Sequence, residues 1–204
     1  FTTAPWADSG TPAATQNAVG PDGAVSAWTF TDNSAAANEG KHQTVAVNAA
    51  TYTWSCLVAK TSGAQASYPV LWGFNSATIA VAATVDTSNG VATNWTAYTG
   101  FTVNGITARC TSHNALFWLV ELVFTGTAAT WDFYLFAAGT TNATQSTGIL
   151  DVAAQGSAVF YGDQVELGSF ATPYIPTTTV AVARNADILT YTGAEIANYK
   201  AMAC

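Results

Sequence analysis

Four aromatic side chains stand in or beside polar sequence, where a ring can be presented to a ligand. They are Trp72, Trp95, Tyr98 and Tyr134. Trp and Tyr combine a large apolar ring face with a polar edge, so they can stack on a sugar ring while neighbouring groups bond its hydroxyls. Trp95 and Tyr98 lie in a loop-like stretch, where an aromatic has no obvious core role. These residues are candidates for carbohydrate binding, with packing in the core as the alternative for each.

Two acidic residues, Glu121 and Asp132, lie inside strongly apolar, strand-like segments. If residues 116–124 and 131–136 pair as a hairpin, both carboxylates share one open sheet face and join the carbohydrate-binding candidates. Two carboxylates at a suitable spacing also hydrolyse glycosidic bonds. A polysaccharide-degrading hydrolase or lyase that uses these two acids therefore stays open as an alternative, and so does a simple solvated sheet face.

The overall charge narrows the class of partner. The chain has 204 residues, with 12 Asp and Glu against 5 Lys and Arg, and a net charge of −7. Nucleic-acid binding needs a basic face that neutralises phosphates, so no nucleic-acid partner is expected. No stretch approaches the roughly 18 uninterrupted apolar residues of a membrane span, so no span is expected. Because charged residues make up only 8% of the chain, Thr, Ser, Asn and Gln must provide the polar surface.

Hydrophobic periodicity predicts strands throughout most of the chain. Residues 52–58 alternate between apolar and polar, and residues 116–124 are apolar on both faces except at one acid. Turn signals separate such segments, for example at residues 86–90, where Asn89 and Gly90 are expected to supply positive φ angles. The pattern predicts an all-β fold, specifically a two-sheet antiparallel β-sandwich (jelly roll).

The predicted domain organisation is simple. Residues 1–19 are rich in Ala, Thr, Pro and Gly and predict an irregular lead-in, and residues 20–191 are predicted to form the sandwich domain. Residues 192–204 would begin a following segment or linker that contains a short terminal helix. Pro173 and Pro176 fix φ and remove two N–H donors, so the segment after the last strand is predicted to be an extended tail.

The three cysteines have no metal-ligand spacing. They are Cys56, Cys110 and Cys204, and the odd number leaves at least one thiol unpaired within the chain. Cys56 and Cys110 lie in strand-like segments that can be neighbours in a sandwich. A disulfide between them and two buried free thiols are both open from the sequence, because a disulfide requires a geometry that only the fold decides.

Three blocks, in order along the chain, carry a resemblance to a known family. They are residues 20–28 (Gly-Pro-Asp-Gly, then Ser-Ala-Trp), residues 51–60 (Thr-Tyr-Thr-Trp-Ser-Cys-Leu-Val-Ala-Lys) and residues 164–178 (Gln-Val-Glu-Leu-Gly-Ser-Phe-Ala-Thr-Pro-Tyr-Ile-Pro-Thr-Thr). Together they resemble bacteriophage tail and structural proteins with a carbohydrate-binding-module-like jelly roll, of the concanavalin A-like or galactose-binding-like kind. One departure is that residues 104–110 keep the Arg of the family's Gly-Trp-x-Arg strand but lack the Trp.

The resemblance implies a non-catalytic carbohydrate-binding module on a virion surface or in the extracellular space. The partners it implies are a polysaccharide or cell-surface glycan and other virion proteins, with a homo-oligomer as a further arrangement. The alternative is virion assembly without sugar binding, since a fold alone does not determine a function. Related jelly rolls often carry a structural Ca²⁺ between an N-terminal loop and the final strand, which makes Asp22, Asp163 and Glu166 the candidate metal ligands.

Overall fold

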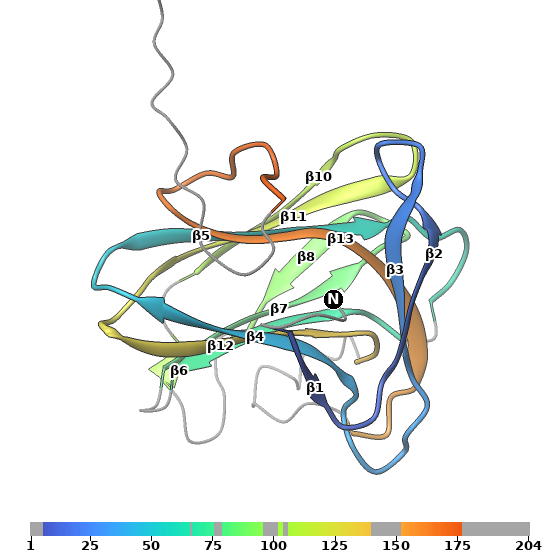
Figure 1. The fold of residues 1–204 in the computed structure, drawn as a ribbon, viewed down its shortest axis with the longest axis horizontal. Coiled ribbons are helices and arrows are strands. Elements are labelled where there is room, and N and C mark those ends of the chain that lie inside the picture. Colours follow the sequence, from blue (N-terminus) through green and yellow to red (C-terminus); the bar gives the residue numbers. More distant parts are fainter. Residues whose placement is uncertain are drawn as a thin grey trace, which may run out of the picture.

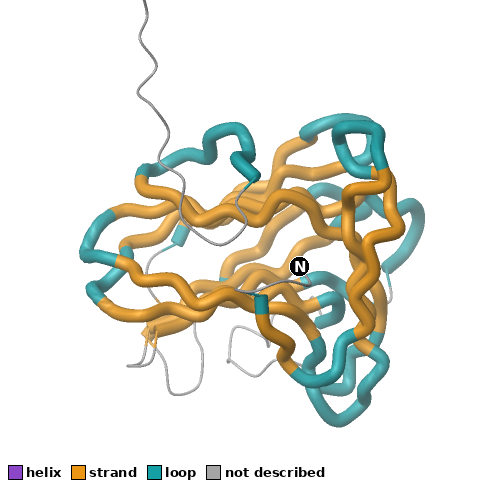
Figure 2. The backbone as a smooth tube through the Cα atoms, in the orientation of Figure 1, coloured by secondary structure: helices purple, strands orange, loops and turns teal. Residues whose placement is uncertain are grey.

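The computed structural model describes residues 6–65, 67–75, 79–95, 102–103, 106–139 and 152–176. This part of the chain folds as a β-sandwich of two antiparallel sheets that face each other (Figures 1 and 2). It contains no helix, and so none long and apolar enough to cross a membrane. The predicted all-β, two-sheet antiparallel sandwich is confirmed for these residues. The short helix expected after residue 192 lies outside them.

The first sheet, which we call sheet A, has its strands in the order β1-β4-β12-β6-β7-β8, and the two-residue β9 lies parallel to β7. The strands of sheet A are β1 (Ala7–Ser9), β4 (Gly40–Val47), β12 (Ala129–Phe136), β6 (Val70–Asn75), β7 (Ile79–Asp86), β8 (Val91–Asn94) and β9 (Thr102–Val103). Neighbours such as β4 and β12 are far apart in sequence. Sheet A is therefore built from segments that are distant in sequence.

The second sheet, which we call sheet B, has the order β10-β11-β5-β13-β3-β2. Its strands are β10 (Thr107–Ser112), β11 (Phe117–Thr125), β5 (Thr51–Ala59), β13 (Gly156–Leu167), β3 (Val25–Asp32) and β2 (Ala13–Val19). The last strand, β13, lies between β5 and β3, and Figure 1 shows it in orange beside the teal β5. The final strand of the described chain is thus central in its sheet.

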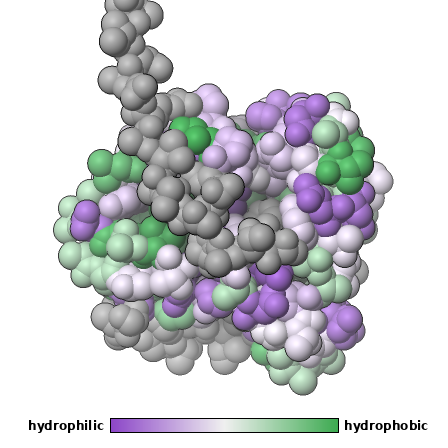
Figure 3. All heavy atoms as spheres, viewed as in Figure 1, coloured by the Kyte–Doolittle hydropathy of each residue, from purple (hydrophilic) through white to green (hydrophobic). Residues whose placement is uncertain are grey.

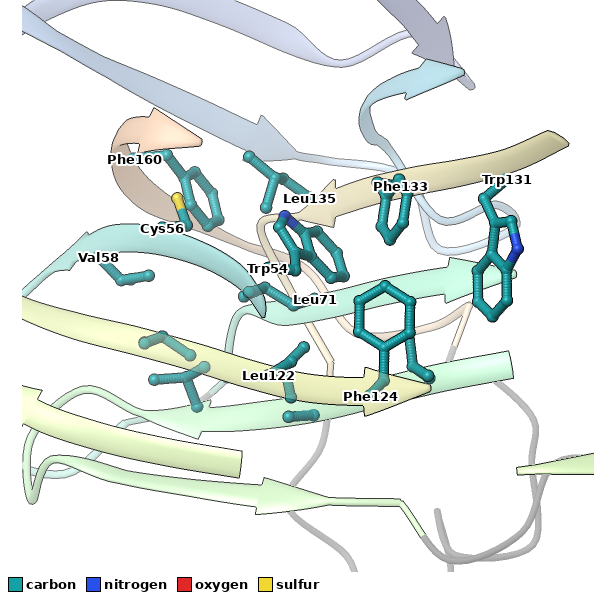
Figure 4. Packing of buried hydrophobic residues seen from close by; sticks show 14 of the residues in the cluster. Trp54, Cys56, Val58, Leu71, Leu122, Phe124, Trp131, Phe133, Leu135 and Phe160 are labelled. Carbon is teal, nitrogen blue, oxygen red and sulfur yellow. The ribbon is translucent and has the colours of Figure 1, made fainter. Parts of the chain in front are cut away.

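The core lies between the two sheets, and aromatic rings from both meet in it (Figure 4). Trp54, Cys56 and Val58 of β5 point inward from sheet B, as the alternation of residues 52–58 predicted. The ring of Trp54 packs edge-on against Phe133 of sheet A, with 5.0 Å between the ring centroids. Each large apolar side chain buried in this way contributes roughly 1.5–3 kcal/mol. The surface is less uniformly apolar than this core, because the side of the molecule drawn in Figure 3 has both hydrophilic and hydrophobic residues.

Two predicted features of the fold are wrong. Residues 116–124 and 131–136 do not pair as a hairpin, because β11 lies in sheet B between β10 and β5, whereas β12 lies in sheet A between β4 and β6. The connection at residues 126–128 therefore crosses from one sheet to the other. Nor is the described part of the N-terminal region an irregular lead-in, because residues 7–9 and 13–19 form the edge strands β1 and β2.

Cys56 and Cys110 are both free thiols. Each is the cross-strand partner of Val120, so the whole of β11 lies between them. Two strand spacings put their backbones about 10 Å apart, which exceeds the reach of a disulfide. Burial raises the pKa of the Cys56 thiol well above its usual value and that of Cys110 to about 11. Of the two alternatives open from the sequence, the structure has the free thiols.

Candidate functional site

Three of the six predicted carbohydrate-binding residues lie together on the outer face of sheet A. Trp131 and Phe133 of β12 point into the core, and successive residues of a strand point to opposite faces. Asp132 and Tyr134 therefore point outward, and Tyr134 is directly opposite Trp72 of β6. The register of the sheet thus brings a carboxylate and two aromatic rings to one surface.

Rings in contact with one another extend from Tyr134 in both directions across this surface. They are those of His42, Tyr134, Trp72 and Phe74, which we call the aromatic row. Ring centroids are 4.4 Å apart for His42 and Tyr134, 5.2 Å for Tyr134 and Trp72, and 4.5 Å for Trp72 and Phe74. All four side chains are partly exposed. Because ring pairs at these distances attract one another, the row is held in place before a ligand arrives.

Polar groups lie beside the aromatic row. Thr44 is opposite Asp132 in the sheet, and its hydroxyl donates a hydrogen bond of 2.5 Å to Asp132 Oδ1. The described residues give Asp132 no other hydrogen bond, which leaves Oδ2 able to accept one. His42 Nδ1 is buried and has no hydrogen-bond partner among the described residues. Burial lowers the pKa of His42, against the opposing effect of Asp132 and Asp8, so the imidazole is neutral at pH 7.

This arrangement suits a flat ligand that carries hydroxyl groups. The faces of these rings pack largely on one another, so Trp72 and Tyr134 offer a ligand their partly exposed apolar portions. The carboxylate of Asp132 is a strong acceptor for a hydroxyl proton. The exposed hydroxyl of Thr44 can rotate to accept or donate. Stacking supplies contact area, while the carboxylate and hydroxyl fix the orientation of the ligand.

Trp95 packs on the same side of sheet A, in a cluster that Trp72 and Tyr134 contact, but it is buried there. Its side chain is only 3% exposed, and it packs with Val70, Ala82 and Phe136. Its indole N–H donates a hydrogen bond of 2.9 Å to Thr84 Oγ1. Of the two alternatives left open for Trp95, ligand binding and packing, the structure shows packing. Tyr98, the other aromatic of that stretch, lies outside the described residues.

Glu121 lies on the outer face of sheet B, on the opposite side of the sandwich from Asp132. It is 9% exposed, and its Oε1 accepts a hydrogen bond of 2.9 Å from the backbone N–H of Ala171. The expectation that the two carboxylates share one sheet face is wrong, because it depended on the hairpin that does not form. With packed sheets about 10 Å apart and the two side chains pointing away from each other, the pair cannot act on one glycosidic bond.

Residues 168–176, which we call the strap, follow β13 and lie on the outer face of sheet B. Glu166 holds the strap through Thr172, whose N–H donates to Oε1 at 2.7 Å and whose hydroxyl donates to Oε2 at 2.6 Å. Gln164 accepts a hydrogen bond of 2.9 Å from the N–H of Ile175. Tyr174 packs edge-on against Tyr161, with 5.5 Å between ring centroids. Tyr174 and Ile175 of the predicted tail thus contact sheet B.

The three predicted metal ligands are used separately. Asp22 accepts hydrogen bonds from Ser26 Oγ and the N–H of Ala24 in the turn after β2. Asp163 lies at an irregularity of β13 and accepts a hydrogen bond of 2.7 Å from Trp54 Nε1. Glu166 holds the strap. Within the described residues no group of three or more His, Cys, Asp or Glu side chains could hold a metal ion, so the calcium ion stays a prediction without a site there.

Sequence reasoning missed three residues that complete the surface: His42, Thr44 and Phe74. His42 and Thr44 are two residues apart in β4, as Asp132 and Tyr134 are in β12. The period of two was therefore present in the sequence, but the partnership of β4 with β12 was not, because 81 residues separate the two strands. Without knowledge of that pairing, nothing in the sequence indicates that His42 and Thr44 belong to a binding surface.

A scan against protein-family models found no match to this chain, and a search of curated proteins found none either.

Proposed function

We propose that this chain is a non-catalytic glycan-binding module that holds a sugar chain on the outer face of sheet A. The observation that carries the proposal is the juxtaposition of Trp72, Tyr134 and Asp132. These residues were singled out from the sequence for carbohydrate chemistry, and they occupy neighbouring positions on adjacent strands. His42 and Thr44 extend the same surface with a neutral imidazole and an exposed hydroxyl.

The finer assignment is a jelly roll of a bacteriophage structural protein, acting on a virion surface or outside the cell. Its support is the resemblance in residues 164–178, together with a sandwich in which neighbouring strands are far apart in sequence, as in Greek-key and jelly-roll folds. Residues 164–176 also have a physical role, because they supply both the strap and two of the side chains that hold it.

The binding mode is shallow stacking with a few hydrogen bonds. Partly exposed rings on a sheet face remove less ligand surface from water than a deep pocket does, so affinity for one sugar segment is expected to be weak. Several copies on one particle would raise the overall strength, because each further contact is intramolecular once the first is made. A virion surface supplies such copies.

A polysaccharide screen that records both binding and the release of reducing ends tests the proposal. Tyr134→Ala removes a ring of the row, and Asp132→Asn removes the charged acceptor with little change of shape. Each is expected to weaken binding by about tenfold or more, which corresponds to about 1.4 kcal/mol. Phe170→Ala is the matched control, because it removes an aromatic that is 65% exposed on the strap, beside the other sheet.

The outcomes separate the classes of function. Binding without product release, lost in Asp132→Asn and retained in Phe170→Ala, supports the proposal. Release of reducing ends or of unsaturated products contradicts the non-catalytic assignment. Unchanged binding in both Asp132→Asn and Tyr134→Ala contradicts the assignment to the outer face of sheet A, even where Tyr134→Ala lowers stability.

An assembly module without sugar binding is the second candidate, and one observation favours it. Leu167 is 69% exposed and Phe170 is 65% exposed, so two large apolar side chains near the strap contact water. Exposed apolar residues that cluster on a surface often mark contacts between proteins. Light scattering of the wild type and of Phe170→Ser tests this candidate, which requires a defined oligomer that the substitution dissociates.

A further inference from the structure

We infer that the aromatic row accepts an uncharged glycan and rejects glycans that carry carboxylate, sulfate or phosphate groups. This inference rests on the proposed function and adds the chemical class of the ligand. It comes from the distribution of charge in the whole chain, which is a separate observation from the juxtaposition of rings that supports glycan binding.

Three of the five cations belong to the described residues, and none of them lies on the outer face of sheet A. Lys41 alternates with His42 in β4, points to the opposite side of that strand, is 9% exposed and pairs with Asp8. Lys60 follows β5 of sheet B, where its Nζ lies 4.2 Å from the ring centroid of Trp118. Arg109 is in β10, the edge strand of sheet B.

The connecting segments next to these strands in sequence add no positive charge. Residues 76–78 and 96–101 adjoin β6 and β8, and residues 140–151 follow β12. None of the three contains a Lys or an Arg, and the last contains Asp151. The remaining two cations, Arg184 and Lys200, lie outside the described residues.

The outer face of sheet A carries a negative charge. Asp132 is the only acidic residue among those placed here on the outer face of sheet A, and the imidazole of His42 stays neutral at pH 7 because burial lowers its pKa. An anionic sugar bound beside Tyr134 would lie close to this carboxylate, and no Lys or Arg of the described residues lies on that face to offset the repulsion. A neutral sugar instead donates its hydroxyl protons to Asp132, so the same group favours one class and disfavours the other.

The test compares three forms of one neutral polysaccharide that binds the protein. The first is the native polymer, the second has its primary alcohols oxidised to carboxylates, and the third has those carboxylates converted to methyl esters. At low salt the carboxylate form is expected to bind at least about tenfold more weakly than the native form. The methyl ester is expected to recover most of the loss, and added salt to narrow the difference by screening.

Asp132→Asn supplies the matched variant. It is expected to bind the native polymer more weakly than the wild type does, and to show a smaller penalty for the carboxylate form. Equal or tighter binding of the carboxylate form by the wild type overturns the inference. A screen in which only anionic polysaccharides bind also overturns it. In both cases the proposed glycan binding itself stands. Failure of every neutral and anionic polysaccharide to bind overturns the proposed function as well.

Discussion

At the scale of single residues, Asp163 is a carboxyl that contacts a core tryptophan. Its Oδ1 accepts a hydrogen bond of 2.7 Å from Trp54 Nε1, a ring of the core, at the point where β13 loses its regular pairing with β5. Burial raises the pKa of Asp163 from 3.8 to about 7, although the bond from Trp54 acts in the opposite direction. The folded protein therefore keeps this proton up to near neutral pH.

This raised pKa predicts a pH dependence of stability. Between about pH 4 and about pH 7 the folded state binds the Asp163 proton and the unfolded state does not, so the free energy of unfolding contributed by this group falls as pH rises. Asp163→Asn keeps an oxygen for Trp54 and removes the titration. Because the side chain is partly solvated, we expect the variant to gain only roughly 1–3 kcal/mol over the wild type between these limits. Urea unfolding of both proteins at about pH 5 and about pH 8 measures the gain, and a constant difference would contradict it.

Gly90 predicts a second effect at this scale. Its φ is 69°, and a Cβ there would lie 2.6 Å from the ring of Trp118. Gly90→Ala is expected to cost roughly 2–4 kcal/mol, from left-handed backbone strain and from overpacking. Gly23→Ala is the matched control, because its φ is 79° but its Cβ meets nothing within 4 Å. Denaturant unfolding should therefore show the smaller loss for Gly23→Ala, and equal losses would exclude the contact with Trp118.

Single residues also show where sequence reasoning succeeds and fails. Trp54 was predicted to be in the core from simple alternation, and it is fully buried. Asn89 and Gly90 were both expected to have positive φ angles, but only Gly90 has one. The carboxylate of Asp86 accepts the N–H groups of Ser88 and Asn89, and these bonds give a different type of turn. Such side-chain bonds to the backbone depend on local geometry that composition does not reveal.

At the scale of elements, the strap is a segment held by side chains of the strand that precedes it. Glu166→Ala removes the acceptor of the Thr172 N–H and hydroxyl and of Gln164 Nε2, and is expected to lower the free energy of unfolding by roughly 1–3 kcal/mol. The exposed Phe170 should then become a faster site of chymotrypsin cleavage, and the Thr172 amide should exchange faster with solvent.

Glu166→Gln is the control, because its side-chain amide can both accept from the Thr172 N–H and donate to the Thr172 hydroxyl. Unchanged cleavage in Glu166→Ala would show that the strap is held by other contacts.

Part of the set of strands was predictable from the sequence, but the pairing of the strands was not. Periodicity located β5, β7, β11, β12 and β13, since each buries alternate residues or both faces. It missed β1 and β2, whose burial patterns are mostly exposed because both are sheet edges, and it also missed β4, β6 and β8. The short connection between β11 and β12 suggested a hairpin, yet a connection of that length can also cross between sheets. The candidate site depends on such pairings, so the sequence could name Trp72, Asp132 and Tyr134 without showing that they meet.

At the scale of the whole molecule, the two outer faces of the sandwich differ in what lies on them. The outer face of sheet A presents the aromatic row, whereas that of sheet B receives the strap. Pro176, the last described residue, follows Ile175, whose N–H is bonded to Gln164 of sheet B. A support attached through the C-terminal side therefore begins on the face opposite the aromatic row. This geometry lets many copies present their rings to one glycan surface.

That arrangement predicts strong avidity from a weak site. A biotin tag added after residue 204 and bound to streptavidin gives a tetramer, and its apparent affinity for a glycan-coated surface is expected to exceed that of the monomer on the order of a hundredfold or more. The gain arises because the second contact forms at the high local concentration created by the first. The Asp132→Asn tetramer is the control. Its affinity is expected to fall more than that of the Asp132→Asn monomer, because each of its four sites binds the glycan more weakly. Surface plasmon resonance at matched protomer concentration measures the ratio, and equal binding by monomer and tetramer would show that the outer face of sheet A cannot engage one surface in several copies at once.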